Sequence, residues 1–362
     1  MKKTDRLASK KYGIMVHYLN GMQNGKHSPN NPLPAPTDWD GCVRDFDVDA
    51  FAAAVHRSGA GYVFFTLCQV SAYICAPSAV FDEITGGGCV GASTTRDLPM
   101  ELAHALAKYD IDLYLYFTGD GPQGDGVAAE KFGTLNLTGN RVTEEFVIKW
   151  ASVMREFAVR YGSLVKGWWI DAGFDYIGYT DDLLKYYKDA ALAGNPDAVI
   201  AFNNGVVRLD FDDPDVISLS DGETRMDKAI DIINAKALAG DRLAAEVIHR
   251  YDTPKKYRYS IHDDYTAGEA SYYNEIPTTG EVDGCLWQVM SFLGHSYCMP
   301  LYGVICGWGR PGCRYSAEYI RDYTNAVNSV GGVVTYDVCV NRFGEVDEGQ
   351  LAVLSKIKNQ DP

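Results

Sequence analysis

The stretch "VKGWWIDAGFD", from Val165 to Asp175, is an apolar and aromatic run that ends in an aspartate, Asp171. Burying a carboxylate costs free energy unless the group is paired or takes part in chemistry. A helix N-cap or a loop salt bridge would account for Asp171, and so would a catalytic carboxylate at the mouth of a barrel. A small residue and a glycine follow Asp171 and leave room for a ligand, so we favour the catalytic interpretation.

Similar apolar runs recur along the chain and alternate with amphipathic segments of helical periodicity. Near-continuous apolar strands separated by helices predict a parallel sheet covered on both faces. Over this length the pattern favours a (β/α)8 barrel formed by one domain, residues 1–362. A doubly wound open sheet is the alternative, but no glycine fingerprint follows the first strand. The predicted strands are 12–18, 61–67, 111–117, 165–171, 198–204 and 332–338, with a possible strand at 215–221, and the predicted helices are 46–60, 97–110, 143–162, 181–194, 225–240, 317–330 and 347–358.

The net charge of −15 argues against a nucleic-acid partner, because phosphate binding needs a basic surface. The sequence contains no run of about 18 apolar residues, so it predicts no membrane span. The basic start has no apolar segment behind it, so we expect a cytoplasmic protein, although a trimmed secreted form would look the same. The nine cysteines include no CxxC pair and indicate thiols in a reducing compartment. The scattered histidines predict neither a metal site nor a cofactor.

In a (β/α)8 barrel the site is built from residues that follow the carboxyl ends of the strands. Here those positions carry amides, carboxylates and aromatic rings, which suit a neutral ligand rich in hydroxyl groups, and hence a carbohydrate. Trp168 and Trp169 point to opposite sides of their strand, so one of them belongs to the core. Asp337, at the end of the last strand, could instead cap the final helix. The expected substrate-binding residues are His17, Gln69, Tyr73, Trp168, Trp169 and Asn203.

Several segments together resemble the α-L-fucosidases of glycoside hydrolase family 29 and related fucosidase-like proteins. The resemblance covers nearly the whole chain and implies a (β/α)8 barrel with a retaining glycosidase activity. It also implies that Asp171 is the nucleophile and that His17 contacts the sugar. The segments that carry it are "KYGIMVHY" (11–18), "FDVDAFAAAVHRSGAGYVFFT" (46–66), "RYGSLVKGWWIDAG" (160–173), "NPDAVIAFNNG" (195–205) and "AEYIRDYTNAVNSVGGVVTYDV" (317–338).

The chain departs from this family at the second strand. The fucosidases carry "KHHDG" there, and its two histidines bind sugar hydroxyls, whereas this chain has "CQVSA" with Gln69 and Val70 at the aligned places. The "LWQ" at 286–288 also lacks the histidine associated with the fucosidase-like proteins. The β-sandwich that commonly follows the fucosidase barrel is not expected after the last helix. Because of these differences, the resemblance does not identify the sugar on which the protein acts.

A retaining glycosidase needs a second carboxyl about 5–5.5 Å from the nucleophile. Glu269 in "DDYTAGE" (263–269) is our preferred acid/base because this segment resembles the corresponding segment of the fucosidases. Glu223 in "LSDGETR" (219–225) and Asp215 in "DFDDPD" (210–215) are the alternatives.

The sequence therefore predicts a fucosidase-like hydrolase that cleaves α-L-fucose or a related sugar with retention and needs no cofactor. A barrel that binds sugar without cleaving it is a second hypothesis, because the histidine pair is missing. A hydrolase for a different sugar is a third. A metal-dependent sugar isomerase or hydrolase would need several histidines at strand ends, and only His17 is well placed.

Overall fold

A computed structural model gives the arrangement of most of the chain. It describes residues 2–24, 38–89, 91–134, 142–205, 212–223, 239–251, 258–295, 297–299 and 304–358, and, between 229 and 237, residues 229, 232–233 and 235–237.

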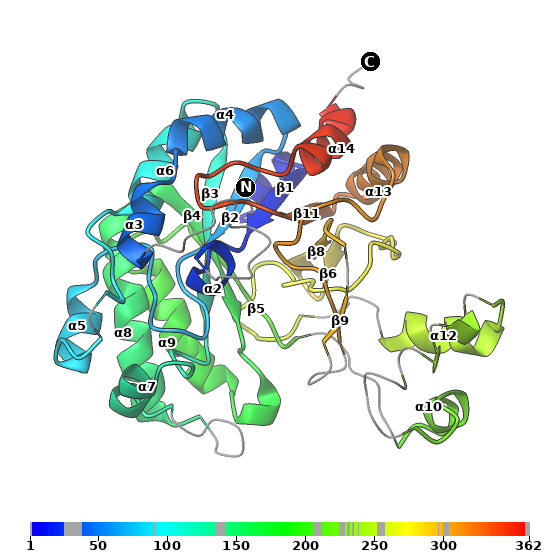
Figure 1. The fold of residues 1–362 in the computed structure, drawn as a ribbon, viewed down its shortest axis with the longest axis horizontal. Helices are drawn as coiled ribbons and strands as arrows, with labels where there is room; N and C mark the ends of the chain where they lie inside the picture. The colour runs from blue at the N-terminus through cyan, green and yellow to red at the C-terminus, as the bar shows by residue number, and fades with distance from the viewer. Residues whose placement is uncertain are drawn as a thin grey trace.

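One curled sheet of seven strands forms the centre of the molecule (Figure 1). Its order is β5-β4-β3-β2-β1-β11-β8, and every neighbouring pair is parallel. Two small antiparallel pairs, β6 with β7 and β9 with β10, lie beside it. The strands are β1 (Tyr12–Val16), β2 (Tyr62–Thr66), β3 (Asp112–Thr118), β4 (Val165–Asp171), β5 (Val199–Phe202), β6 (Glu281–Val282), β7 (Cys285–Leu286), β8 (Gln288–Phe292), β9 (Tyr297–Met299), β10 (Val304–Cys306) and β11 (Val333–Val338).

Helices cover the outer face of this sheet, with α4, α6, α8, α9, α13 and α14 forming the surrounding layer. The parallel sheet and the alternation of strands and helices confirm the predicted α/β architecture. The helices are α1 (Asp5–Ser9), α2 (Asn20–Gln23), α3 (Trp39–Arg44), α4 (Val48–Ser58), α5 (Ala79–Thr85), α6 (Leu98–Ala107), α7 (Gly126–Phe132), α8 (Glu144–Tyr161), α9 (Asp181–Leu192), α10 (Pro214–Leu219), α12 (Arg242–Tyr251), α13 (Ala317–Ser329) and α14 (Glu348–Lys358).

The predicted helix boundaries have the expected local causes. The Asp47 carboxylate accepts a hydrogen bond from the Ala50 amide and begins α4, which ends at Gly59 in the left-handed conformation. Asp97 caps α6 in the same way through the Met100 amide. Each cap satisfies a backbone donor that the helix itself leaves unpaired.

An irregular segment, 264–270, is hydrogen-bonded to both edges of the seven-stranded sheet. On one side the Asp264 amide donates to the Ile200 carbonyl of β5 at 2.8 Å. On the other side the Ala270 amide donates to the Met290 carbonyl of β8, and the Met290 amide donates to the Gly268 carbonyl. The segment forms only isolated parallel bridges with β7 and β8. Among the described residues the sheet thus has seven regular strands and one irregular connection between its edges, instead of the eight regular strands that the sequence predicts.

Gly268 permits this close approach, because its φ is +65° and a Cβ atom there would lie 2.0 Å from the Gln288 carbonyl oxygen. We expect Gly268→Ala to lower the free energy of unfolding by about 2 kcal/mol or more, since it combines backbone strain with a clash against main chain. Urea denaturation measures the change. Gly284→Ala is the matched control, because Gly284 also has a positive φ but nothing within 4 Å. Equal losses in the two variants would contradict this account.

Alternate residues of each strand face opposite sides of the sheet, as the strand geometry requires. In β4, Trp168 and Ile170 belong to the large cluster between sheet and helices, whereas Trp169 belongs to the cluster enclosed by the curled sheet. Asp171 follows Trp169 by two residues and therefore shares its inner face. The inner cluster consists mainly of Leu7, Met15, Tyr62, Phe64, Tyr114, Tyr116, Trp169, Val199, Ala201, Tyr265, Ala267, Leu286, Met290 and Val333.

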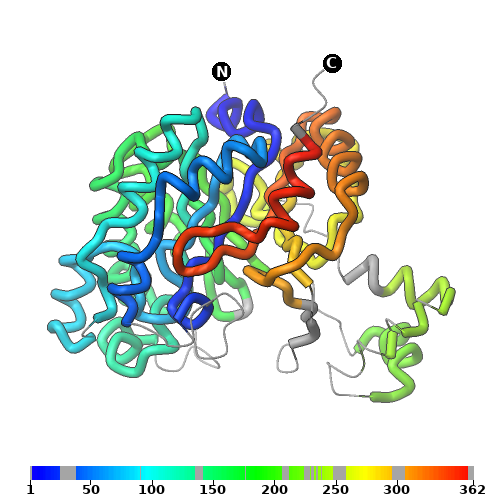
Figure 2. The backbone as a smooth tube through the Cα atoms, turned by 45° about the horizontal axis from the view of Figure 1, so that its top comes forward, coloured from blue at the N-terminus to red at the C-terminus, as the bar shows by residue number. Residues whose placement is uncertain are grey.

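The possible strand at 215–221 was a wrong prediction, because residues 214–219 form α10. Pro214 occupies the first helical turn, and the Asp213 carboxylate accepts from the Asp215 amide, so local capping outweighs the apolar run. The predicted helix at 225–240 lies partly outside the described residues. Helices α10 and α12 lie to one side of the sheet and its helical layer (Figure 2). They share a small apolar cluster of their own, formed by Val216, Leu219, Ile233, Ala244 and Val247.

Eight of the nine cysteines, all except Cys298, are seen to form no disulfide, which agrees with the expected thiols. None of the described helices is both long and apolar enough to cross a bilayer.

Candidate active site

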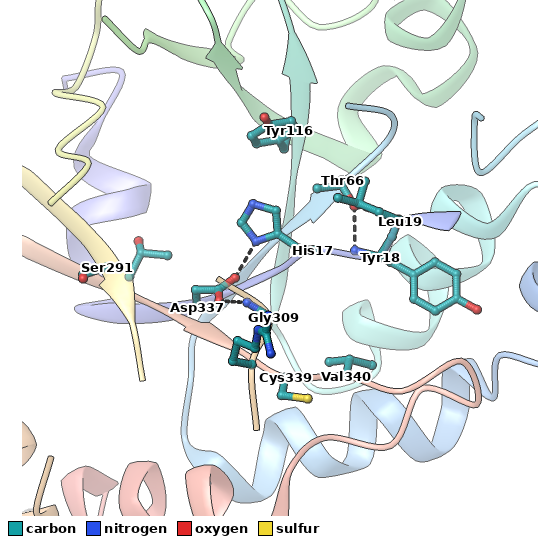
Figure 3. Close-up of polar contacts among 12 residues, drawn as sticks. His17, Tyr18, Leu19, Thr66, Tyr116, Ser291, Gly309, Asp337, Cys339 and Val340 are labelled. Carbon is teal, nitrogen blue, oxygen red and sulfur yellow. Dashed lines mark hydrogen bonds and ion pairs between the residues drawn. The ribbon is translucent and has the colours of Figure 1, made fainter. Parts of the chain in front are cut away.

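The carboxyl ends of the parallel strands meet at one edge of the sheet, and polar inward side chains gather there. They come from β3, β4 and β11, from the residues directly after β1 and β5, and from the irregular segment 264–270. Figure 3 shows three of them, with His17 and Asp337 bonded to each other below Tyr116. The set consists of His17, Tyr116, Asp171, Asn203, Glu269 and Asp337.

Asp171 is the last residue of β4, and each of its carboxylate oxygens accepts a hydrogen bond. The Tyr116 hydroxyl donates to Oδ2, and the Asn203 amide nitrogen donates to Oδ1 at 2.8 Å. Burial, and then the Asp171 charge, raise the pKa of Tyr116 well above its ordinary value, so this phenol keeps its proton and remains a donor. The Asp171 side chain is half-buried. The two hydrogen bonds orient the Asp171 carboxylate, and the side chain remains partly exposed, so a ligand could reach it.

Glu269 is brought next to Asp171 by the irregular segment. Its Oε2 accepts a hydrogen bond of 2.5 Å from the same Asn203 nitrogen that donates to Asp171 Oδ1. The two carboxylate oxygens therefore lie no further apart than the sum of the two bonds, 5.3 Å. Retaining glycosidases separate their two carboxyl groups by about 5–5.5 Å, whereas inverting ones leave about 6.5–9.5 Å for a water. The two carboxyl groups are therefore close enough to act on the same glycosidic bond.

The two other acid/base candidates lie elsewhere. Glu223 follows α10 in a turn where its amide donates to the Ser220 carbonyl, and Asp215 lies in the first turn of α10. That part of the chain stands to one side of the sheet in Figures 1 and 2. No described contact joins either residue to Asp171, and their proposed acid/base roles remain predictions.

His17 is oriented by a buried partner from the opposite end of the sequence. Its Nδ1 lies 2.6 Å from Asp337 Oδ2, and the other Asp337 oxygen accepts from the Gly309 amide (Figure 3). Burial raises the pKa of Asp337 above its ordinary value, and the contact with His17 partly offsets this. Asp337 therefore does not cap the final helix, where Asp347 accepts from the Gln350 amide instead.

The surroundings of the His17 ring determine which atom a ligand could reach. Tyr116 and Trp308 pack against the ring, with centroid distances of 5.9 and 5.5 Å. The neighbouring Tyr18 amide donates to Thr66 Oγ1 at 2.8 Å and fixes the chain on leaving β1. The Nε2 atom of His17 has no hydrogen-bond partner among the residues that the structure describes. It is the ring atom available to a ligand hydroxyl.

The two tryptophans of β4 have different roles. Trp168 is 1% exposed and lies in the cluster under the outer helices, so its expected contact with substrate is wrong. Trp169 lies inside the curled sheet, where it stacks on Tyr116 at 5.2 Å and its indole donates to the Ala267 carbonyl. Its neighbours place Trp169 next to Tyr116 and to the segment that carries Glu269.

Gln69 and Tyr73 lie in the loop after β2, and no described contact joins either of them to Asp171. The Gln69 side chain is half-buried and makes no hydrogen bond within the described residues. Tyr73 packs edge-on against Trp39 at 6.0 Å. Their proposed contacts with substrate remain predictions.

Two aromatic residues of the site were missing from the sequence-based set. Tyr116 shares the inner face with Asp171, as the pairing of Tyr116 with Trp169 and of Thr118 with Asp171 shows. The period-two pattern of 111–117 could have indicated it. Trp308 lies in a loop without periodicity and carried no such signal. Within the described ranges, no group of three or more His, Cys, Asp or Glu side chains is placed to hold a metal ion.

A third carboxyl, Asp120, lies just beyond β3 and is 7% exposed. It accepts hydrogen bonds from the Thr118 hydroxyl and the Gln123 amide. Burial raises its pKa to about 7, and the Asp171 charge adds to this effect. Asp120 therefore takes up a proton near neutral pH in the folded protein.

This pKa predicts a dependence of stability on pH. Between about pH 4 and 7 the folded protein holds a proton on Asp120 that the unfolded chain has released, so the free energy of unfolding falls as pH rises through this window. We expect Asp120→Asn to remove up to about 4 kcal/mol of this fall. Urea denaturation from pH 4 to 8 measures it. Part of the slope should persist, because burial also raises the pKa of Asp263 to about 7. If the free energy of unfolding of Asp120→Asn falls with pH as steeply as that of the native protein, the raised pKa of Asp120 is refuted.

No protein-family model and no curated protein matches this sequence. Solved structures do match over nearly its whole length. The fold is shared with fucosidases and endo-fucoidan hydrolases. The endo-fucoidan hydrolase P5AFcnA of glycoside hydrolase family 107 is 13% identical, with a TM-score of 0.64 over 99% of this chain and 93% of that one. The α-L-fucosidase AlfC from Lactobacillus casei, in complex with α-L-fucose, is 14% identical, with a TM-score of 0.58 over 98% and 97% of the two chains.

The endo-fucoidan hydrolase MfFcnA4 is also similar, with 14% identity and a TM-score of 0.61, but the chain spans only about half of its length, 54%. These identities are low, so the likeness to the fucosidases is a likeness of fold. At that level it confirms the resemblance on which the sequence-based expectations depend.

Proposed function

We propose that this protein is a retaining glycoside hydrolase that acts on α-L-fucose or a closely related sugar in a glycan. The observation that carries the proposal is the pair of carboxyl groups, Asp171 and Glu269, held within 5.3 Å by one amide nitrogen. The fold shared with fucosidases and endo-fucoidan hydrolases supports the choice of sugar.

We further propose that the irregular segment 264–270 takes the place of the sixth strand of a (β/α)8 barrel. It is hydrogen-bonded to β5 on one side and to β8 on the other. In this arrangement the β strands 1–5, the segment, β8 and β11 form one ring in chain order, and the chain forms one catalytic domain.

In the proposed mechanism, an Asp171 oxygen attacks the anomeric carbon while the glycosidic bond breaks. Glu269 gives its proton to the departing oxygen, and a glycosyl ester of Asp171 remains. Glu269 then takes a proton from a water molecule whose oxygen attacks the same carbon and releases Asp171. The Tyr116 hydroxyl orients Asp171 by donating to its Oδ2. In the first step the negative charge passes from Asp171, which becomes a neutral ester, to Glu269, which has lost its proton. The two displacements give net retention without a metal or organic cofactor.

Recognition of the sugar is proposed to centre on His17. Its Nε2 faces no protein partner among the described residues, and Asp337 holds the ring in place. Trp308, which is partly exposed, supplies an apolar ring face beside it, and such a face suits the C–H faces of a sugar. Gln69 and Val70 stand where the fucosidases carry their histidine pair, so hydroxyl recognition on that side differs from theirs.

A panel of 4-nitrophenyl glycosides tests the proposal. It includes the α-L-fucoside, α-L-galactoside, α-L-rhamnoside and β-D-fucoside, together with fucoidan oligosaccharides. We expect turnover of an α-L-glycoside, and proton NMR of the first product should show the α anomer. An inverted first product would exclude the retaining mechanism. If calorimetry detects binding of the sugars but no member of the panel is cleaved, the binding-only barrel replaces the hydrolase.

A further inference from the structure

Asn203, the first residue after β5, uses every hydrogen-bonding group that it has. Its backbone amide donates to the Ile170 carbonyl at 2.7 Å, and its carbonyl accepts from the Gly173 amide at 3.1 Å. Its side-chain oxygen accepts from the Gly205 amide at 3.1 Å. Its side-chain nitrogen donates to Asp171 and to Glu269, and the residue is only 2% exposed. Both hydrogens of its NH2 group are used, so no donor of its amide is left for a sugar hydroxyl.

The orientation of this amide is fixed by its surroundings. The Gly205 N–H can donate only to the side-chain oxygen of Asn203. The two carboxylate oxygens can accept only from its NH2 group. If the amide were flipped, its oxygen would face the two carboxylates and its NH2 group would face the Gly205 N–H. All three hydrogen bonds would then be lost. Both NH2 hydrogens therefore point at the two carboxyl groups.

We infer that Asn203 is a positioning residue that sets the spacing of the two carboxyl groups and the place of the proton on Glu269, instead of a sugar-binding residue. The inference rests on the proposed function of Asp171 and Glu269. Because Oε2 of Glu269 already accepts from Asn203, the acidic proton sits on Oε1. Oε1 is then the atom that meets the departing glycosidic oxygen, and Asp171 Oδ1 is held as an acceptor throughout.

Loss of this amide has a defined electrostatic result. A hydrogen bond to a charged carboxylate stabilises the charged form, so removing the donor raises the pKa of each carboxyl. The rate falls at low pH when Asp171 takes up a proton and at high pH when Glu269 loses one. Both limbs of the profile of kcat/KM against pH therefore move to higher pH in a variant without the amide.

The first experiment measures these profiles for Asn203→Ala and Asn203→Asp. The second variant keeps the shape and the acceptor for Gly205. We expect both limbs to rise by about one pH unit and kcat to fall about 100-fold, with KM little changed. Asn204→Ala is the matched control, because the neighbouring Asn204 accepts from the Asp175 amide and lies on the other side of the chain. A rise in KM with both limbs at their native pH would overturn the inference and restore a sugar-binding role.

A second measurement does not depend on turnover. Carbon-13 NMR of labelled carboxyl groups, assigned with Asp171→Asn and Glu269→Gln, follows both titrations in the native protein and in the two variants. Raised pKa values for both carboxyls in the variants support the inference even if no glycoside is cleaved, and in that case only the proposed function fails. Unchanged pKa values in the variants overturn the inference. If the native protein nevertheless cleaves the fucoside, the proposed function still holds.

Discussion

We expect Asp171→Ala to lose at least about 1,000-fold in kcat on any glycoside that the native protein cleaves, because Asp171 is the group that forms the glycosyl ester in the proposed mechanism. Initial rates on the best substrate of the panel measure the loss. Asp175→Ala is the matched control, because Asp175 is an exposed aspartate of the same loop. Its backbone amide donates to Asn204 and its carbonyl accepts from the Gly178 amide, and its side chain makes no hydrogen bond within the described residues. We expect that variant to stay within about twofold of the native rate.

Azide separates a missing nucleophile from a damaged fold. In Asp171→Ala it can attack the anomeric carbon from the side that Asp171 has vacated, and the product should be a glycosyl azide of inverted configuration. Far-ultraviolet circular dichroism checks that the variant is folded, since it leaves the Tyr116 hydroxyl and the Asn203 amide without one acceptor each. A folded variant that keeps a tenth of the native rate would show that Asp171 is not the nucleophile.

The Glu269→Ala variant has the second largest expected effect, and the effect depends on the leaving group. Natural linkages leave as poor alkoxides and need the proton, so we expect their kcat to fall about 1,000-fold. A 4-nitrophenolate leaves readily without a proton, and its first step should be much less affected. Comparing the two substrate types in one variant measures the contribution of Glu269 as an acid.

Azide should also restore turnover of the 4-nitrophenyl substrate in Glu269→Ala, because it attacks the glycosyl ester without help from a base, and this product should have retained configuration. Glu223→Ala serves as the comparison, since Glu223 follows α10 and no described contact joins it to Asp171. The assignment fails if Glu223→Ala loses turnover of natural linkages and Glu269→Ala does not.

Most strands of the central sheet could be predicted from the sequence. A strand in a parallel sheet is buried on both faces, so it appears as a nearly continuous apolar run. The run 165–171 coincides with β4, and its position places Asp171 at the carboxyl end of the strand. Period-two alternation left one ambiguity, whether Trp168 or Trp169 faces inward. Only the register with β3 resolves it, since Tyr116 pairs with Trp169. Local pattern thus fixes a strand but not the identity of its two faces.

The rest of the site depends on contacts that no local pattern encodes. Asp337 and His17 lie at the ends of two strands that are far apart in the sequence and adjacent in the sheet, so their pairing follows from ring order alone. The segment 264–270 lacks strand periodicity and was proposed as an acid/base region only by its resemblance to the fucosidases. Its position between β5 and β8 comes from tertiary hydrogen bonds, and Gly268 permits the close approach to β8.

The two carboxyl groups stand on elements of unequal regularity. Asp171 ends β4, which has continuous ladders to β3 and β5, whereas Glu269 belongs to a segment held by isolated bridges. We expect amide protons of such a segment to exchange with solvent through small local openings, and those of β4 to exchange only on global unfolding. The backbone beside the leaving group would then open far more often than the backbone that carries Asp171.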